Sequence, residues 1–310
     1  MGRRYKEKTI LSGGHDKAVA SVAFSLSGNY VATAGLDGRV CVWEAEEGTL
    51  LHRYSGKSAA LCLAWVPSGE ETLLFGTADG NIGMLTMAIA LNDLSMSGFW
   101  AHRKPIEHIA VTGNLLASGA FTELKVWRWH PLGWSFRCEQ SLPEPPKTSH
   151  NEHDEMLVTS IHWTGTEYHP LLLVTYMHHG CQCVSCPLCL SYLFDPARAS
   201  LSPDGSLLAI SNLATGFDVY RTDTEQPVGM YRHDVGKRQP TPVLFIHGGQ
   251  AIVGGSTVGA VNIWDMKLGK LHALTVPSVS PRTRYNVKLL NQLTSPRSGS
   301  CSSYSGLSRL

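Results

Sequence analysis

The stretch that decides the fold runs from Gly14 to Glu44 and reads GHDKAVASVAFSLSGNYVATAGLDGRVCVWE. It holds three short runs of alternating apolar residues, separated by turns at Ser27-Gly28-Asn29 and at Asp37-Gly38. Alternation at period two, interrupted by tight glycine-containing turns, predicts antiparallel strands joined by hairpins. The stretch is therefore predicted to form one small β-unit, bracketed by a Gly-His pair and a Trp-Glu pair.

The same pattern returns along the chain at steps near forty residues. Leu85 and Trp127 follow Trp43 at successive steps of 42 residues, and each ends a run similar to residues 30–43. Two later repeats end at Tyr220 and Trp264, and a weaker repeat lies between residues 158 and 180. A four-stranded sheet cannot bury both of its faces alone, so six such repeats predict a stack of small sheets.

These repeats resemble the WD40 repeat, which forms one blade of a β-propeller. The resemblance covers most of the chain, and it is strongest in the first and last repeats. It implies an all-β WD40-type β-propeller with about six recognisable blades. A seven-bladed ring with a degenerate or incomplete last blade is the alternative that the repeats leave open. In the family, a strand ahead of the first repeat usually completes the last blade, and Tyr5–Leu11 is expected in that role.

The resemblance also implies a structural set of side chains inside each blade. In the family, a buried hydrogen-bonded group of His, Ser or Thr, Asp and Trp holds the strands together. The first repeat matches this group in full, at His15, Thr33, Asp37 and Trp43. The second repeat has Lys57 and Leu85 where the histidine and the tryptophan would stand. We interpret His15 and Asp37 as part of this structural group, since the chain has no nucleophile-elbow pattern that would make them a catalytic acid and base.

Partners of WD40 proteins bind the rim of the central channel. Carried over to this chain, the rim positions near the inner strands and the turns are Lys17, Leu36, Ala78 and Phe121. We expect these residues to contact other proteins or peptides. The prediction comes from the resemblance, because the four side chains share no chemistry that would identify a ligand.

Composition narrows the class of partner and the compartment. The formal net charge is +1 and charged residues make up 16% of the chain, which favours neither a nucleic acid nor an anionic membrane as partner. No apolar run approaches the ~18 residues that a membrane span needs. The segment 1–6 lacks the apolar core of a secretory signal. We therefore predict an intracellular protein, in the cytoplasm or the nucleus. No phosphate-binding loop is present, and no cofactor is predicted.

A cysteine cluster breaks the repeat pattern, and three interpretations of it stay open. The cluster consists of Cys181, Cys183, Cys186 and Cys189. Four thiolates suit zinc or a redox role, although the two Cys-x-x-Cys pairs share Cys186 and so cannot supply two separate loops. The cluster can also be a degenerate strand with chance cysteines. Finally, Val184-Ser185 is what a read-through splice donor encodes, so residues 184–198 can be non-native coding sequence.

The C-terminal segment differs in composition from the repeats. Residues 277–310 contain nine serines, five basic residues and no acidic residue. Such a segment cannot pack a core, so we predict a propeller over residues 1–276 and a basic, disordered tail over 277–310. Val279-Ser280 raises the same question of coding sequence for residues 279–310.

The function predicted from these observations is non-catalytic. A rigid propeller surface that binds other proteins or peptides, and so assembles complexes, fits the repeats best. The alternative is a zinc-binding or redox role centred on residues 181–189.

Overall fold

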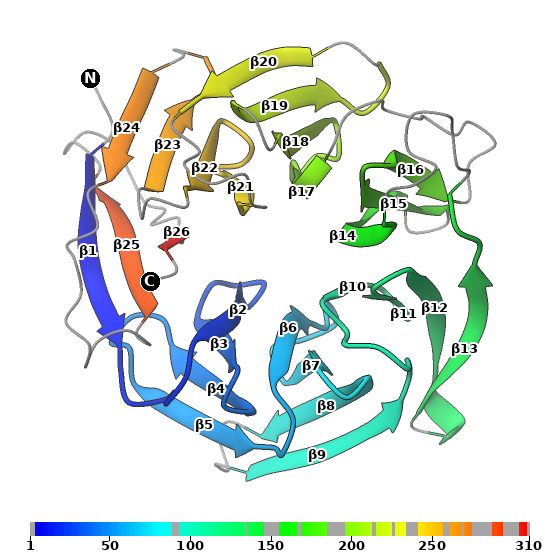
Figure 1. Cartoon of the computed structure of the whole chain (residues 1–310). Helices are drawn as coiled ribbons and strands as arrows, with labels where there is room; N and C mark the ends of the chain where they lie inside the picture. Colours follow the sequence, from blue (N-terminus) through cyan, green and yellow to red (C-terminus); the bar gives the residue numbers. More distant parts are fainter. Residues whose placement is uncertain are drawn as a thin grey trace. The chain divides into compact units, whose positions relative to one another are not determined.

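A computed structural model describes most of the chain, and its strands are drawn in Figure 1. The residues described are 4–88, 93–133, 135–145, 155–166, 169–184, 196–212, 215–224, 227–233, 241–256, 261–267, 270–274, 287–293 and 304–308. They form two compact units, one of Met1–Gly113 with Ser278–Leu310 and one of Asn114–Pro277. Both units consist almost entirely of β-strands, as the sequence predicted.

The first unit contains two complete four-stranded sheets, each built from consecutive strands. Blade one has the order β2-β3-β4-β5 and blade two the order β6-β7-β8-β9. The strands of this unit are β1 (Arg4–Leu11), β2 (Val19–Phe24), β3 (Tyr30–Gly35), β4 (Arg39–Glu44), β5 (Leu50–Ser55), β6 (Ala60–Trp65), β7 (Thr72–Thr77), β8 (Asn81–Ala88), β9 (Asp93–Trp100), β10 (His108–Thr112), β25 (Val287–Leu293) and β26 (Tyr304–Ser308). Every repeat predicted in this part of the sequence is therefore one sheet.

The second unit repeats the same plan. Its strands are β11 (Leu115–Ala120), β12 (Glu123–His130), β13 (Ser135–Leu142), β14 (Leu157–Gly165), β15 (Pro170–Met177), β16 (Gly180–Val184), β17 (Pro196–Leu201), β18 (Leu207–Asn212), β19 (Gly216–Arg221), β20 (Pro227–Arg232), β21 (Val243–Ile246), β22 (Ala251–Gly255), β23 (Val261–Asp265) and β24 (Lys270–Leu274), with a short 3-10 helix η2 (Pro131–Gly133). Blade five is β17-β18-β19-β20 and blade six is β21-β22-β23-β24, and blade three ends in β11-β12-β13.

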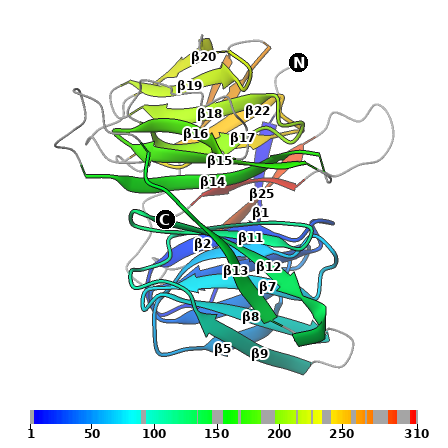
Figure 2. The same cartoon turned by 90° about the vertical axis from the view of Figure 1, so that its right-hand side faces the viewer.

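Blade four has three strands among the described residues, in the order β14-β15-β16. Residues 185–195, where a fourth strand would follow, lie outside the described part of the chain. Strand β17 of blade five packs against β14 and β15, and Figure 2 shows these strands one beneath another. The short interval that breaks the repeat in the sequence thus falls directly after β16.

The predicted outer strand ahead of the first repeat is β1, but its partner is unexpected. β1 pairs antiparallel with β25, from Arg4↔Leu293 to Leu11↔Val287, and β26 completes a three-stranded sheet. Figure 1 shows β1 and β25 side by side. The sequence predicted no regular structure in 277–310, whereas the structure has two strands there. β25 forms by pairing with β1, which is far away in the sequence, and its sequence VKLLNQL holds four apolar residues within an otherwise polar segment. The boundary at residue 276 stays a prediction.

The core consists of apolar side chains packed between neighbouring sheets. In the first unit, Ala32 and Val40 of blade one pack with Phe75, Leu85 and other apolar residues of blade two. Trp65 adds a polar link here, since its indole Nε1 donates to the Ala23 carbonyl at 3.1 Å. Packing of this kind explains why the apolar residues of the strands occur on both faces of each sheet.

Candidate functional site

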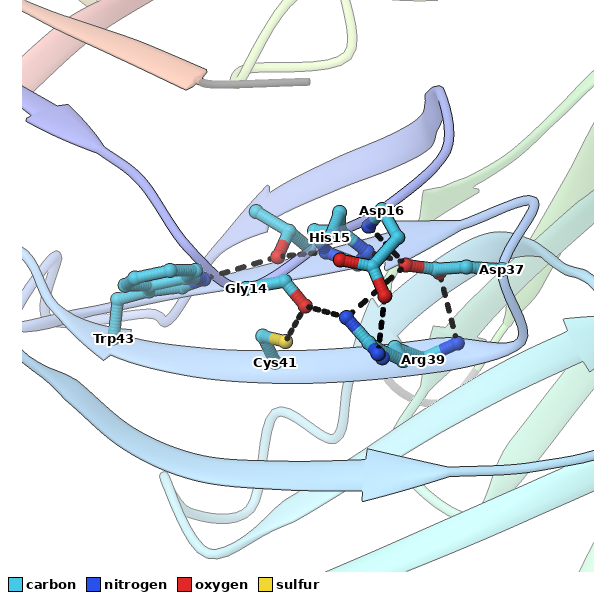
Figure 3. A network of polar contacts seen from close by, with 8 residues as sticks. Gly14, His15, Asp16, Asp37, Arg39, Cys41 and Trp43 are labelled. Atoms are coloured by element: carbon cyan, nitrogen blue, oxygen red, sulfur yellow. Dashed lines mark hydrogen bonds and ion pairs between the residues drawn. The ribbon is translucent and has the colours of Figure 1, made fainter. Parts of the chain in front are cut away.

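The sequence-predicted group in blade one comes together as one chain of hydrogen bonds. His15 precedes β2, Thr33 lies in β3, Asp37 lies in the turn after β3, and Trp43 lies in β4. His15 Nδ1 is 3.1 Å from Asp37 Oδ1, and His15 Nε2 is 2.8 Å from Thr33 Oγ1. Trp43 Nε1 donates to the same Thr33 hydroxyl at 3.0 Å. Figure 3 shows Trp43 and Asp37 at opposite ends of this chain of contacts.

The Asp37 carboxylate is the charged end of the network. It accepts hydrogen bonds from the backbone N–H of Asp16 at 2.8 Å and of Arg39 at 3.1 Å. Burial would raise the pKa of Asp37, but these two N–H groups and the His15 ring outweigh it and lower the pKa below its usual value. Asp37 is therefore ionised at neutral pH, and it fixes the orientation of the His15 ring.

Arg39 extends the network, and the sequence analysis missed it. Its guanidinium forms an ion pair with Asp16 and donates to the Gly14 carbonyl at 3.3 Å. Arg39 directly follows the Asp37-Gly38 turn, so a basic residue just after that turn was the available signal. The ion pair spans from the loop before β2 to the start of β4, and it ties two elements of blade one together.

The order Asp37, His15, Thr33 has the connectivity of a catalytic triad, but burial argues against that reading. Thr33 is fully buried and its hydroxyl already accepts from Trp43 while bonded to His15. The His15 and Asp37 side chains are 2% and 6% exposed. A nucleophile must contact its substrate, and the Thr33 hydroxyl is buried and already bonded to His15 and Trp43. The arrangement fits a structural role, which stays a prediction.

The corresponding positions of blades two and three hold partial versions of the network. In blade two, Thr77 Oγ1 donates to Asp79 Oδ1 at 2.6 Å, while the apolar Leu85 is buried and Lys57 is exposed. In blade three, Trp127 Nε1 donates to Ser118 Oγ at 2.8 Å. In each blade, the two remaining members named here stay bonded although other members of the group are replaced.

The residues predicted to bind partners lie at exposed or partly exposed positions. Lys17 is exposed, Leu36 is 44% exposed and Ala78 is partly exposed. Leu36 N donates to the Ala18 carbonyl and Ala78 N to the Ala59 carbonyl, both at 2.9 Å. The two turns of the first unit therefore present Leu36 and Ala78 in the same way.

Phe121 belongs to the second unit and is held differently. It has a φ of 59°, which is rare for a residue other than glycine, and it is 42% exposed. Its carbonyl accepts from Val158 N at 2.8 Å. The blade-three turn is one residue shorter than the turns of blades one and two, and this positive φ is the conformation that the shorter turn uses.

The cysteine cluster is described only in part. Cys181 and Cys183 lie in β16, where Cys181 is buried and Cys183 is partly exposed, and burial raises the pKa of the Cys181 thiol. Cys186 and Cys189 lie outside the described residues. Within the described part of the chain, no group of three or more His, Cys, Asp or Glu side chains is placed to hold a metal ion. Cys181 and Cys183 both lie in strand β16, so the described half of the cluster fits the interpretation as a degenerate strand.

In the first unit, the described cysteines Cys41 and Cys62 are also poor nucleophiles. Burial raises the pKa of both Cys41 and Cys62 to about 12, so their thiols stay protonated at neutral pH.

No helix in the described ranges has the length and apolarity that crossing a membrane requires.

Comparison with known proteins identifies the repeat and the fold. Residues 6–44 match the family "WD domain, G-beta repeat". A search of solved structures finds the WD40 repeats of RRP9, with a TM-score of 0.68 over 92% of both chains at 15% sequence identity. This likeness shows the fold, and it confirms the prediction of a WD40-type β-propeller.

Curated relatives match shorter segments. A ribosome biogenesis protein BOP1 homolog of Arabidopsis thaliana is 39% identical over 61 residues, which is 20% of this chain and 8% of the relative. Eukaryotic translation initiation factor 3 subunit I of Neurospora crassa is 29% identical over 75 residues, which is 24% of this chain and 22% of the relative. The matched segments thus span less than a quarter of either relative.

Proposed function

We propose that this chain, which has the WD40-type β-propeller fold, is a non-catalytic scaffold on which other proteins or peptides assemble. The observation that carries the proposal is the repeated presentation of Leu36 and Ala78. Each follows the second strand of its blade, and each is fixed by the same backbone hydrogen bond at 2.9 Å. Side chains held at fixed, repeated positions on a rigid framework suit the recognition of a partner surface.

The chemistry of the buried groups supports the non-catalytic part of the proposal. The triad-like residues of blade one are bonded to one another and shielded from solvent. The buried thiols of Cys41 and Cys62 are held protonated. A scaffold needs none of these groups to react, and none of them is open to a substrate.

The relatives support an intracellular, multiprotein setting for this scaffold. One has a name that assigns it to ribosome biogenesis, and another is called a subunit of a translation initiation factor. We infer a place in the cytoplasm or nucleus and partners that are proteins, with no specific nucleic acid or membrane among them. Lys17 and Phe121 complete the set of proposed contact residues.

The test compares two leucines at opposite ends of β3. Leu36 follows β3, and Leu26 lies in the turn before it and is 81% exposed. Immobilised wild-type protein and the Leu36→Asp and Leu26→Asp variants are each incubated with extract of the source organism. Bound proteins are quantified by mass spectrometry. We expect Leu36→Asp to lose the captured partners at least tenfold and Leu26→Asp to keep them. Equal capture by all three proteins would refute the proposed surface.

A further inference from the structure

The turn between β11 and β12 in blade three holds only two residues. Ala120 and Glu123 pair directly across it, so Phe121 and Thr122 make up the whole turn. Phe121 is the first of the two and has a φ of 59°. The favoured two-residue hairpin turns need a positive φ at this position, and glycine adopts it without steric strain. The chain therefore carries a phenylalanine where the backbone favours a glycine.

The corresponding turns of blades one and two follow the ordinary rule. There the positive φ belongs to Gly38 and Gly80, at 77° and 81°. Two further non-glycine residues of the described chain have a positive φ, and both are histidines, His178 and His247. Histidine is enriched in this conformation, whereas a bulky phenylalanine is an outlier in it. The backbone of Phe121 is thus strained, and those of its glycine counterparts in blades one and two are not.

The backbone of this turn has a structural role that a glycine would fill equally well. The Phe121 carbonyl accepts a hydrogen bond from the Val158 N–H of β14 at 2.8 Å, which links blade three to blade four. Gly119 makes room for this contact, since a Cβ atom there would come within 2.8 Å of Val158 Cγ1. The hydrogen bond is made by the backbone alone, so a glycine in place of Phe121 would keep both the bond and the positive φ. What the phenylalanine adds at this position is its ring.

Phe121 lies at the surface of the blade, where a second molecule can contact it. It is 42% exposed, whereas Ala120 before the turn and Leu124 after it are 0% and 2% exposed. A single exposed apolar residue is common and indicates nothing by itself. Strained residues, however, concentrate at functional sites. Exposure and strain together mark Phe121 as a binding residue, on grounds that do not depend on the resemblance of the repeats.

The acidic side chains near the turn indicate which kind of group would contact the ring. Glu155 is exposed and stands three residues before Val158, whose N–H is bonded to the Phe121 carbonyl. Glu123 closes the turn, and Lys125 neutralises it through an ion pair at 3.6 Å. Within the described part of the chain, Glu155 forms no such ion pair. An exposed aromatic ring and an exposed carboxylate are therefore held in the same region of the second unit.

An arginine side chain matches both of these groups. Its guanidinium is planar, stacks on the face of an aromatic ring and pairs with a carboxylate through two N–H groups. We propose that Phe121 and Glu155 bind an arginine side chain in a peptide segment of a partner protein. This inference rests on the proposed scaffold function, because it names the chemistry of the partner at one of the proposed contact residues.

The first test separates the ring from the strain. Phe121→Ala and Phe121→Gly both remove the ring, but only the glycine variant also relieves the strain of the positive φ. We expect Phe121→Gly to unfold at a temperature about 2 °C above that of Phe121→Ala. An equal or lower midpoint for Phe121→Gly would show that the turn is not strained, and it would remove the basis of the proposal.

The second test identifies the chemistry of the partner. Displayed random dodecapeptides are first depleted on the folded Phe121→Gly chain and then selected on the wild-type chain, so the peptides that remain need the ring. We expect them to share an arginine. Fluorescein-labelled synthetic versions are then titrated against wild type and variants by fluorescence polarisation. Phe121→Ala should lose about tenfold in affinity, whereas Phe121→Trp should keep the affinity because an indole also offers an aromatic face.

Charge is tested on both sides of the contact. Glu155→Gln should lose about threefold in affinity at low salt, as expected for an exposed ion pair. Replacing the arginine of the peptide with lysine should cost about as much, because an ammonium has no plane that stacks on the ring. Glu107→Gln, at another exposed position, is the matched control and should bind as wild type does.

Three binding results would overturn the proposal. They are the selection of no peptide after depletion, the selection of peptides without arginine, and wild-type binding by Phe121→Ala. If Phe121→Ala does not fold, Phe121→Trp and Glu155→Gln decide between the same outcomes. The capture experiment with Leu36→Asp tests a residue of another blade, so a failure of the scaffold proposal and a failure of this inference are told apart.

Discussion

Thr33→Val is the sharpest test of the hydrogen-bonded network in blade one. The substitution replaces the hydroxyl with a methyl group and keeps the branched shape, so the change is mainly polar. Two buried groups lose their partner, the Trp43 indole N–H at 3.0 Å and His15 Nε2 at 2.8 Å. A hydrogen bond contributes about 0.5–1.5 kcal/mol, and leaving a buried group unsatisfied costs about 1–3 kcal/mol. We therefore expect a loss of about 2–4 kcal/mol in the free energy of unfolding.

The matched control is Thr77→Val, at the corresponding position of blade two. Thr77 Oγ1 bonds to the Asp79 carboxylate and accepts from the backbone N–H of Asn81. Asp79 is exposed and Asn81 is partly exposed, so water can replace the lost hydroxyl at both groups. We expect a loss of about 1 kcal/mol there. The free energy of unfolding is measured by urea denaturation, followed by tryptophan fluorescence and circular dichroism.

The reasoning is refuted if Thr33→Val costs less than about 0.5 kcal/mol, or no more than Thr77→Val. A double-mutant cycle with His15→Ala gives a further check. The two changes should be strongly non-additive, because both act on one bonded chain.

Three further predictions follow from the same geometry. The folded-state pKa of Asp37 is depressed, so its stabilisation is present above about pH 4 and is lost as the pH falls through that folded pKa; the gap in urea midpoint between wild type and Asp37→Asn should therefore be larger at pH 6 than at pH 3. Iodoacetamide at pH 8 should alkylate the exposed Cys138 in the native state and the buried Cys41 only after unfolding, as peptide mass spectrometry would reveal. Gly80→Ala should lose about 1–3 kcal/mol, since Gly80 has a φ of +81° and a Cβ there would strike the His102 carbonyl, whereas Gly69→Ala meets no neighbour and should change the thermal midpoint little.

The repeat spacing was enough to predict the sheets. Steps of 42 residues from Trp43 led to Leu85 and Trp127, and each of these three residues lies in the third strand of a sheet. Period-two alternation and glycine turns are local signals, so they are readable without knowing which strands meet. The His15 network was predictable for a similar reason, because its members occur at fixed positions of one repeat.

The strand pairing of the chain ends was harder to predict. β25 is seven residues long and stands in a serine-rich segment, so its composition gave little indication of a strand. Its pairing with β1 joins residues near 4–11 to residues near 287–293. Contacts between segments so far apart in sequence depend on the fold of everything between them.

The pairing of Gly83 with Gly98 escaped the sequence analysis for a related reason. Gly83 and Gly98 are ordinary glycines in the sequence, and only the register of β8 and β9 makes them face each other. A register is a property of two strands, whereas a sequence motif describes one.

Blade two shows how a repeat can lose the hydrogen-bonded group and still hold its strands. Where blade one buries the polar Trp43–Thr33 pair, blade two buries Leu85, with Phe75 beside it in the apolar cluster between the blades. Burial of a leucine side chain contributes about 1.5–3 kcal/mol, which is comparable with the network that it replaces. Apolar packing therefore stabilises this blade without a buried histidine. The histidine position is then free to carry Lys57 at the surface.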